Sequence, residues 1–181
     1  MTLILAVDPG FAATGLALME KADDGNWVPL ELKCVRTEKN LAKHAVRVAD
    51  DDAARIQFAA KEISDMILHN SVKRMVVELP DGGGQSARAV RAMALATGMI
   101  VTLAEAHNVA VEYYRPADTR AAAGVPKSVQ GRDKVKEIVM AEMAKRYPSL
   151  ADFGTKAERE HIADALSCFE AALLGNLVRT A

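Results

Sequence analysis

The chain has 181 residues, half of them apolar, so one domain of ordinary size can bury a core without a disulfide or a structural metal. Its 23 basic and 24 acidic side chains nearly cancel, so the net charge does not by itself indicate a nucleic-acid-binding protein. Cys34 and Cys168 are far apart and belong to no CxxC or Cys/His pattern, which argues against a zinc site.

The N-terminus and the apolar runs indicate where in the cell the protein is expected. The first apolar residues have no basic region before them and end at Asp8, so a signal peptide is not expected. No run approaches the length of a membrane span, and two distant cysteines are compatible with a reducing compartment. We therefore expect a cytoplasmic protein with no membrane partner.

The first half of the chain predicts strands separated by turns and one helix. Apolar runs bounded by turn residues predict the strands, which cover 3–7, 14–19, 27–35 and 74–80. Apolar residues at helical spacing predict a helix over 53–69, whereas residues 41–49 show no clear pattern.

The second half predicts a long helix, one more strand and three further helices. Ser86 is a plausible N-cap for a helix that reaches about residue 107. The remaining elements are a strand over 109–113 and helices over 117–123, 133–147 and 158 to about 177. Three antiparallel strands followed by strand–helix alternation predict an α/β fold, a mixed five-stranded sheet flanked by helices. No linker divides the chain, so residues 1–181 are expected to form one domain.

Three acids and a histidine lie at positions that suggest a metal site. Asp8 and Glu78 end the first and fourth strands, and His161 and Asp164 are three residues apart on one helix face beside its apolar stripe. Each has an ordinary alternative: Asp8 as a turn former, Glu78 as a solvated charge, His161 as a surface or capping residue. Together they suit an oxygen-preferring cation such as Mg²⁺. Two such ions can bind the attacking and the leaving oxygen when a phosphodiester is hydrolysed.

These motifs resemble those of the RuvC family of Holliday junction resolvases, which have an RNase H-like fold. "ILAVDPGFAATGLAL" is similar to the family's opening hairpin, "VVELP" to its fourth-strand acid and "HIADAL" to its final helix motif. The resemblance covers nearly the whole chain. It implies a Mg-dependent crossover junction endodeoxyribonuclease, with a homodimer nicking a four-way DNA junction at two sites. The implied ligands of two Mg²⁺ ions, for which Mn²⁺ should substitute, are Asp8, Glu78, His161 and Asp164.

A locally basic stretch supplies candidate DNA-binding residues. Between residues 115 and 146 there are eight Lys or Arg residues and four acids, a pattern that a solvated helix face also explains. The resemblance implies one basic residue after the fifth strand and another at the start of the next helix. These would be Arg120 and Arg132, with Lys134 as an alternative to Arg132. Such groups would hold the scissile phosphate or stabilise its developing charge.

Three other functions remain open. A sugar kinase or chaperone ATPase of the same fold would need a second such domain. A related nuclease could act on other branched DNA, flaps or structured RNA. A non-catalytic DNA-binding module is disfavoured because all four proposed ligands are present.

The loop after the fourth strand departs from the family pattern. Family members commonly carry an aromatic residue there that helps open base pairs at the crossover, whereas this chain has Asp81 followed by three glycines. Either Phe11, beside the first turn, takes over this role, or the enzyme relies on backbone shape. We expect the second, and with it weaker sequence discrimination and cleavage of other branched DNA.

Overall fold

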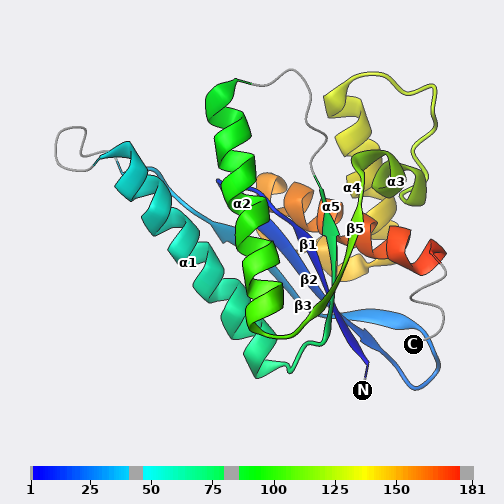
Figure 1. The fold of residues 1–181 in the computed structure, drawn as a ribbon. Helices are drawn as coiled ribbons and strands as arrows, with labels where there is room; N and C mark the ends of the chain where they lie inside the picture. Colours follow the sequence, from blue (N-terminus) through cyan, green and yellow to red (C-terminus); the bar gives the residue numbers. More distant parts are fainter. Residues whose placement is uncertain (1, 41–46, 80–85, 176–181) are drawn as a thin grey trace.

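The computed structural model describes residues 2–40, 47–79 and 86–175. A five-stranded sheet forms its centre, in the order β3-β2-β1-β4-β5 (Figure 1). The strands are β1 (Leu3–Asp8), β2 (Ala13–Lys21), β3 (Trp27–Arg36), β4 (Arg74–Glu78) and β5 (Ala110–Tyr114). Strand β2 is antiparallel to both β1 and β3, and β4 and β5 run parallel to β1. The predicted mixed sheet is confirmed.

Helices cover both faces of the sheet. They are α1 (Val48–His69), α2 (Ala87–Ala106), α3 (Pro116–Ala122), α4 (Arg132–Arg146) and α5 (Lys156–Leu174), with a short 3₁₀ turn at Pro148–Leu150. In Figure 1, α1 and α2 lie on one face, and α5 lies on the other with α3 and α4 packed beside it. The fold therefore has three layers, with helices on both sides of the sheet.

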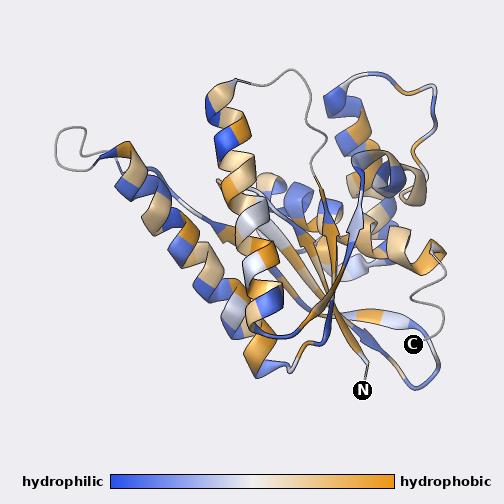
Figure 2. Cartoon of the chain, in the orientation of Figure 1, coloured by the Kyte–Doolittle hydropathy of each residue, from blue (hydrophilic) through white to orange (hydrophobic). Residues whose placement is uncertain are grey.

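Both faces of the central strand β1 are buried, and this packing fixes the position of Asp8 at its end. Leu5 and Val7 point into the core beneath α1 and α2, whereas Ile4 and Ala6 point into the core beneath α5. A strand alternates its side chains between the two faces, so a strand that is apolar throughout belongs in the middle of a covered sheet. Figure 2 shows this as hydrophobic strands between helices that carry both hydrophobic and hydrophilic residues.

Helix ends differ from the predicted ones where polar residues begin or finish a helix. Helix α1 begins at Val48, five residues before the predicted start, because Asp50 and Asp51 in its first turn favour a helix N-terminus without forming an apolar stripe. Helix α5 begins at Lys156, since Thr155 and Glu158 form a capping box. The predicted cap at Ser86 is confirmed: its side chain accepts a hydrogen bond from the Ala89 amide at 3.3 Å.

Helix α2 corrects one expectation from the sequence. By length and composition, one helix among the described residues could cross a membrane, and it is α2, whose most apolar window has a mean hydropathy of 1.4. The sequence expectation missed it because charged residues interrupt the apolar run. Core helices meet the same criterion, and Ile100 of α2 is fully buried beneath the sheet. Val90 and Val101 are about half exposed, so the helix also has an apolar outer side.

Candidate active site

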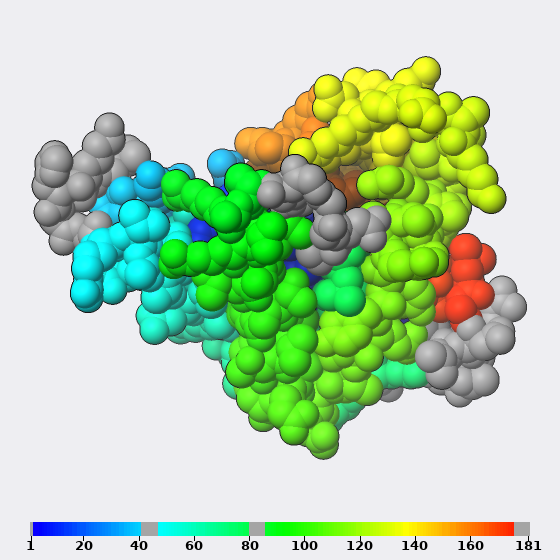
Figure 3. Space-filling model, turned by 45° about the horizontal axis from the view of Figure 1, so that its top comes forward, coloured from blue at the N-terminus to red at the C-terminus, as the bar shows by residue number. Residues whose placement is uncertain are grey.

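The structure brings the four predicted ligands to one cavity. Asp8 and Glu78 end the neighbouring parallel strands β1 and β4, whose register pairs Val7 with Val77. His161 and Asp164 reach the same place from α5. All four side chains line a cavity of about 600 Å³. Figure 3 looks onto this part of the molecule, where atoms of the beginning of the chain and of α5 lie recessed between α2 and the segment that contains α4.

Two glycines permit close backbone contacts near the site, one between β2 and α5 and one within the first turn. Gly15 is the register partner of Asp8, and a Cβ built on it would overlap the carbonyl group of His161. A Cβ on Gly10 would overlap the carbonyl oxygen of Ala13 in the turn itself. Glycine at position 15 therefore lets the helix lie against the strand at the point where His161 meets Asp8.

His161 is hydrogen-bonded to Asp8. The distance from its Nδ1 to Asp8 Oδ2 is 2.9 Å, and this bond is the main reason why the pKa of His161 is raised. A carboxylate can only accept, so Nδ1 carries the proton and donates it. In the neutral imidazole the lone pair is then on Nε2, the nitrogen that could bind a cation.

Asp164 lies in an environment that disfavours its negative charge. Burial, followed by the charges of Asp8 and Glu78, raises its pKa from 3.8 to about 7, while Lys136 and His161 oppose the shift. Like charges placed close together favour protonation of one of them. A cation bound among these carboxylates would remove that repulsion.

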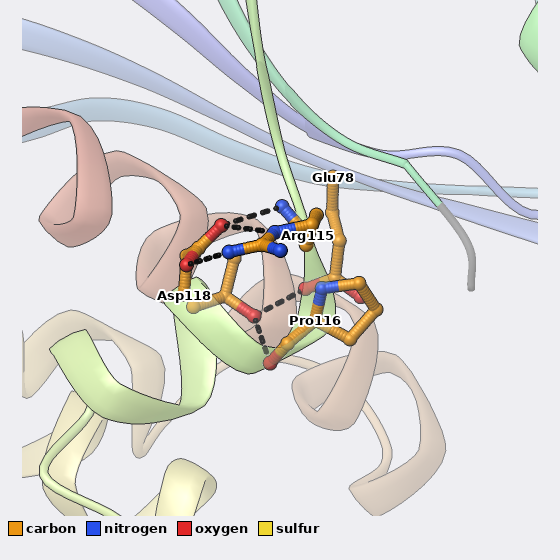
Figure 4. Close-up of polar contacts among 5 residues, drawn as sticks. Glu78, Arg115, Pro116 and Asp118 are labelled. Atoms are coloured by element: carbon orange, nitrogen blue, oxygen red, sulfur yellow. Dashed lines mark hydrogen bonds and ion pairs between the residues drawn. The ribbon is translucent and has the colours of Figure 1, made fainter.

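Glu78 is held by helix α3. Thr119 is buried, and its Oγ1 donates to Glu78 Oε2 at 2.6 Å while lying 3.1 Å from the Pro116 carbonyl oxygen. Figure 4 shows Glu78 facing the start of α3, where Arg115 forms an ion pair with Asp118. This role of Thr119 has no signal in the sequence, because it depends on how α3 packs against the end of β4.

The donor set fits a divalent cation, although the side chains do not form a closed ligand shell. Within the described ranges, no three His, Cys, Asp or Glu side chains are grouped as a ready-made metal site. The four groups instead surround an open cavity and offer carboxylate oxygens, which Mg²⁺ and Mn²⁺ prefer, together with one imidazole nitrogen. The raised pKa of Asp164 is the observation that favours a cation here.

A second group of lining residues, from α3 and α4, forms a basic wall of the cavity, and one predicted residue is not part of it. Arg120 from α3 and Arg132 from α4 line the cavity, as does Lys136. Lys134 is exposed and does not line it, so the structure does not bring Lys134 to this site. Residues four apart share a helix face, so Lys136 lies beside Arg132, whereas a residue two positions away lies on the other side. Helical spacing alone groups Lys136 with Arg132, and the packing of α4 decides that this side of the helix faces the cavity.

Phe11 lies in the turn between β1 and β2, under a guanidinium group. Arg55 of α1 places its Cζ 4.2 Å from the centre of the Phe11 ring, within cation–π range. Thr37 Oγ1 donates to the Phe11 carbonyl at 2.7 Å, which fixes the backbone of the turn. Asp81 lies outside the described residues, so the expectation that rests on it stays a prediction.

Comparisons with known proteins define the fold. No family model matches the sequence, and a search of curated proteins finds no match. Among solved structures, RuvC from Thermus thermophilus has a TM-score of 0.65, with 18% identity, covering 96% of this chain and 97% of that one. The same scores and coverage, with 16% identity, hold for T. thermophilus RuvC in complex with a Holliday junction substrate. The chain thus has the RNase H-like fold of RuvC, as predicted.

A eukaryotic protein shares this fold. The yeast mitochondrial Holliday junction resolvase Ydc2 matches with a TM-score of 0.61 and 12% identity, over 94% of this chain and 77% of the other. Identities this low describe the architecture alone. Function has to be argued from the side chains of the cavity.

Proposed function

We propose that this protein is a metal-dependent endodeoxyribonuclease that resolves four-way DNA junctions by paired nicks. The observation that carries the proposal is a single cavity that is lined both by Asp8, Glu78, His161 and Asp164 and by arginine and lysine side chains. Carboxylates that bind metal ions, in one cavity with arginine and lysine side chains that bind phosphate, suit hydrolysis of a phosphodiester. The likeness to RuvC, one of whose structures contains a Holliday junction substrate, supports four-way DNA as the substrate class.

The side chains divide the work between metal binding and phosphate binding. When bound, two Mg²⁺ or Mn²⁺ ions would supply activation of water and stabilisation of the departing oxygen. Asp8, Glu78 and Asp164 would hold them through oxygens, and His161 through Nε2. The pKa values of Asp164 and His161 are both raised, so cation binding must displace their protons and should become tighter as the pH rises.

A dimer follows from the substrate. Cutting two strands of a two-fold junction needs two active sites, which a homodimer with C₂ symmetry provides. The small-residue helix α2 supports this assignment, because Val90 and Val101 leave an apolar outer side beside its buried one. We also propose that residues 1–181 act as one nuclease domain in the cytoplasm.

A substrate panel tests the function. The purified protein is incubated with a synthetic four-way junction, a three-way junction, a flap, duplex DNA and a structured RNA, with Mg²⁺, with Mn²⁺ and with EDTA. Symmetric nicks in the four-way junction that need a metal and are lost in D164N support the proposal. Preferential cleavage of flaps, other branched DNA or RNA would favour the related-nuclease alternative, and binding without any cleavage would favour a DNA-binding module.

A further inference from the structure

We propose that Lys136 binds a phosphate of the nicked strand next to the scissile one, and that an exchangeable ion pair with Glu160 holds it ready. The inference rests on the proposed function and assigns a further substrate-binding residue to the same site. The position of Lys136 between two cavities carries it.

Lys136 lies where the active-site cavity meets a smaller one. The side cavity has a volume of about 220 Å³ and is lined by residues of α4 and the start of α5, including Lys156. Two residues line both cavities, Arg132 and Lys136. A strand whose scissile phosphate lies among the acids and continues toward the side cavity would therefore pass the Lys136 ammonium group.

A phosphate can replace Glu160 as the partner of Lys136. Its Nζ lies 2.8 Å from Glu160 Oε2, and each side chain is 24% exposed. Ion pairs that solvent reaches contribute little net stability, so a phosphate oxygen can replace the carboxylate at small cost. An ammonium group also has three N–H donors, so it can bind a phosphate while one donor stays on Glu160.

The charge of Lys136 acts on the acids of the site. It lowers the pKa of Asp164 and that of His161, as expected of a cation close to both. The ion pair directs the ammonium toward Glu160 of α5, and Lys136 lines the same cavity as the four proposed ligands. Lys134 lacks this placement, since it is exposed and lines neither cavity.

A merely structural role would make different predictions. If the ion pair only ties α4 to α5, losing either partner should matter equally. If Lys136 binds phosphate, K136M should reduce substrate binding or turnover, whereas E160Q should keep the ammonium and free it for the substrate. K134M is the matched control, because it removes the same charge from the same helix at a position outside both cavities.

The test combines these variants with neutralised phosphates. Binding and single-turnover cleavage are measured for wild type, K136M, K136R, E160Q and K134M on a four-way junction. The same junction is then used with a methylphosphonate replacing either phosphate that flanks the scissile one. We expect the junction affinity or the cleavage rate of K136M to be about 10- to 100-fold lower than that of wild type, the range for a hydrogen bond to a charged group. The affinity and rate of K134M should stay within about twofold of the wild-type values. K136R should recover part of the loss, and E160Q should bind as tightly as wild type or more tightly.

The decisive result is the interaction between variant and substrate. At one flanking position, neutralising the phosphate should remove most of the difference between K136M and wild type. The assignment would be overturned if K136M reduced binding or cleavage by the same factor on every substrate. It would also be overturned if E160Q reduced them as much as K136M does. These results are separable from failure of the proposed function, because a wild-type protein that binds junctions without cleaving them refutes the nuclease while the binding measurements still test Lys136.

Discussion

The two walls of the cavity are built differently. The acidic wall stands on the sheet and on α5, where Asp8 ends a strand buried on both faces and Asp164 is only partly exposed. The basic wall stands on α3 and α4, where Arg120 and Arg132 are exposed. The acids are thus held by the core of the fold, whereas the arginines extend from its surface.

The difference suggests a division of roles. Groups that hold cations need fixed positions, because ligand geometry decides whether an ion binds. Groups that contact a flexible polyanion can be longer and more mobile, since each contributes charge more than geometry. Changes to the acidic wall should therefore abolish chemistry, and changes to the basic wall should weaken binding in small steps.

The largest effect should come from the acids themselves. D8N and D164N keep the shape of the side chain and remove its charge, so cleavage should fall by about 100-fold or more, since metal catalysis contributes several kcal/mol. Junction binding should be retained or strengthened, because less negative charge faces the phosphates. Single-turnover cleavage and anisotropy measure the two quantities. D23N, in the turn before β3, is the control, and full activity in D8N or D164N would refute the metal site.

A substitution that displaces the acidic wall without removing a charge should reduce cleavage nearly as much as D8N or D164N. G15A places a methyl group against the carbonyl of His161, so α5 must shift away from β2. Overpacking of this kind costs roughly 1–3 kcal/mol, and the Tm should fall by several degrees together with activity. G98A is the matched control, because a Cβ there meets nothing within 4 Å. An unaffected G15A protein would mean that helix and strand are not in close contact.

Loss of the hydrogen bond that holds Glu78 should have an intermediate effect. T119V removes the donor of the 2.6 Å bond to Glu78 while keeping the size of the side chain. Groups that orient metal ligands typically contribute 10- to 100-fold in affinity or activity, and we expect a loss in this range. Titration of cleavage against Mn²⁺ concentration measures it. T119S should restore most of the activity, and equal losses in both variants would argue for a packing role.

The pH dependence of stability should distinguish the partly buried Asp164 from the exposed arginines of the basic wall. The pKa of Asp164 is raised in the folded protein, to about 7 from 3.8, so protonation stabilises the fold at low pH and this stability is lost as the pH rises toward 7. The raised pKa of His161 acts in the same direction. In EDTA, the Tm should fall by roughly 5 °C between about pH 5 and pH 8, with a shallower fall in D164N. Mg²⁺ should raise the Tm of the wild type at the higher pH, and parallel curves for the two proteins would contradict the assignment.

The smallest effects are expected on the basic wall. R120A and R132A should each lower the slope of log affinity against log salt by about one unit, with a similar loss on every junction sequence. Anisotropy titrations over a range of salt concentrations measure this slope. K134M should leave it unchanged. If R120A and R132A also leave it unchanged, these side chains do not contact phosphate.

The sequence alone was enough for the architecture and the acids. Apolar runs broken by turn residues predicted all five strands. The signal is clearest for β1, β2 and β4, because strands buried on both faces are continuously apolar in the sequence. Asp8 and Glu78 were recognisable because a charge at the end of such a run is conspicuous. The spacing of His161 and Asp164 placed both on one helix face, again from local information.

The tertiary structure decided what depends on contacts between distant segments. Thr119 is bound to Glu78, 41 positions earlier, and Gly15 is small because α5 lies against it, two facts with no local signal. The choice of Lys136 over Lys134 required knowing which side of α4 faces the cavity. Helix periodicity describes a face, but only the packing of that helix against its neighbours decides what the face meets.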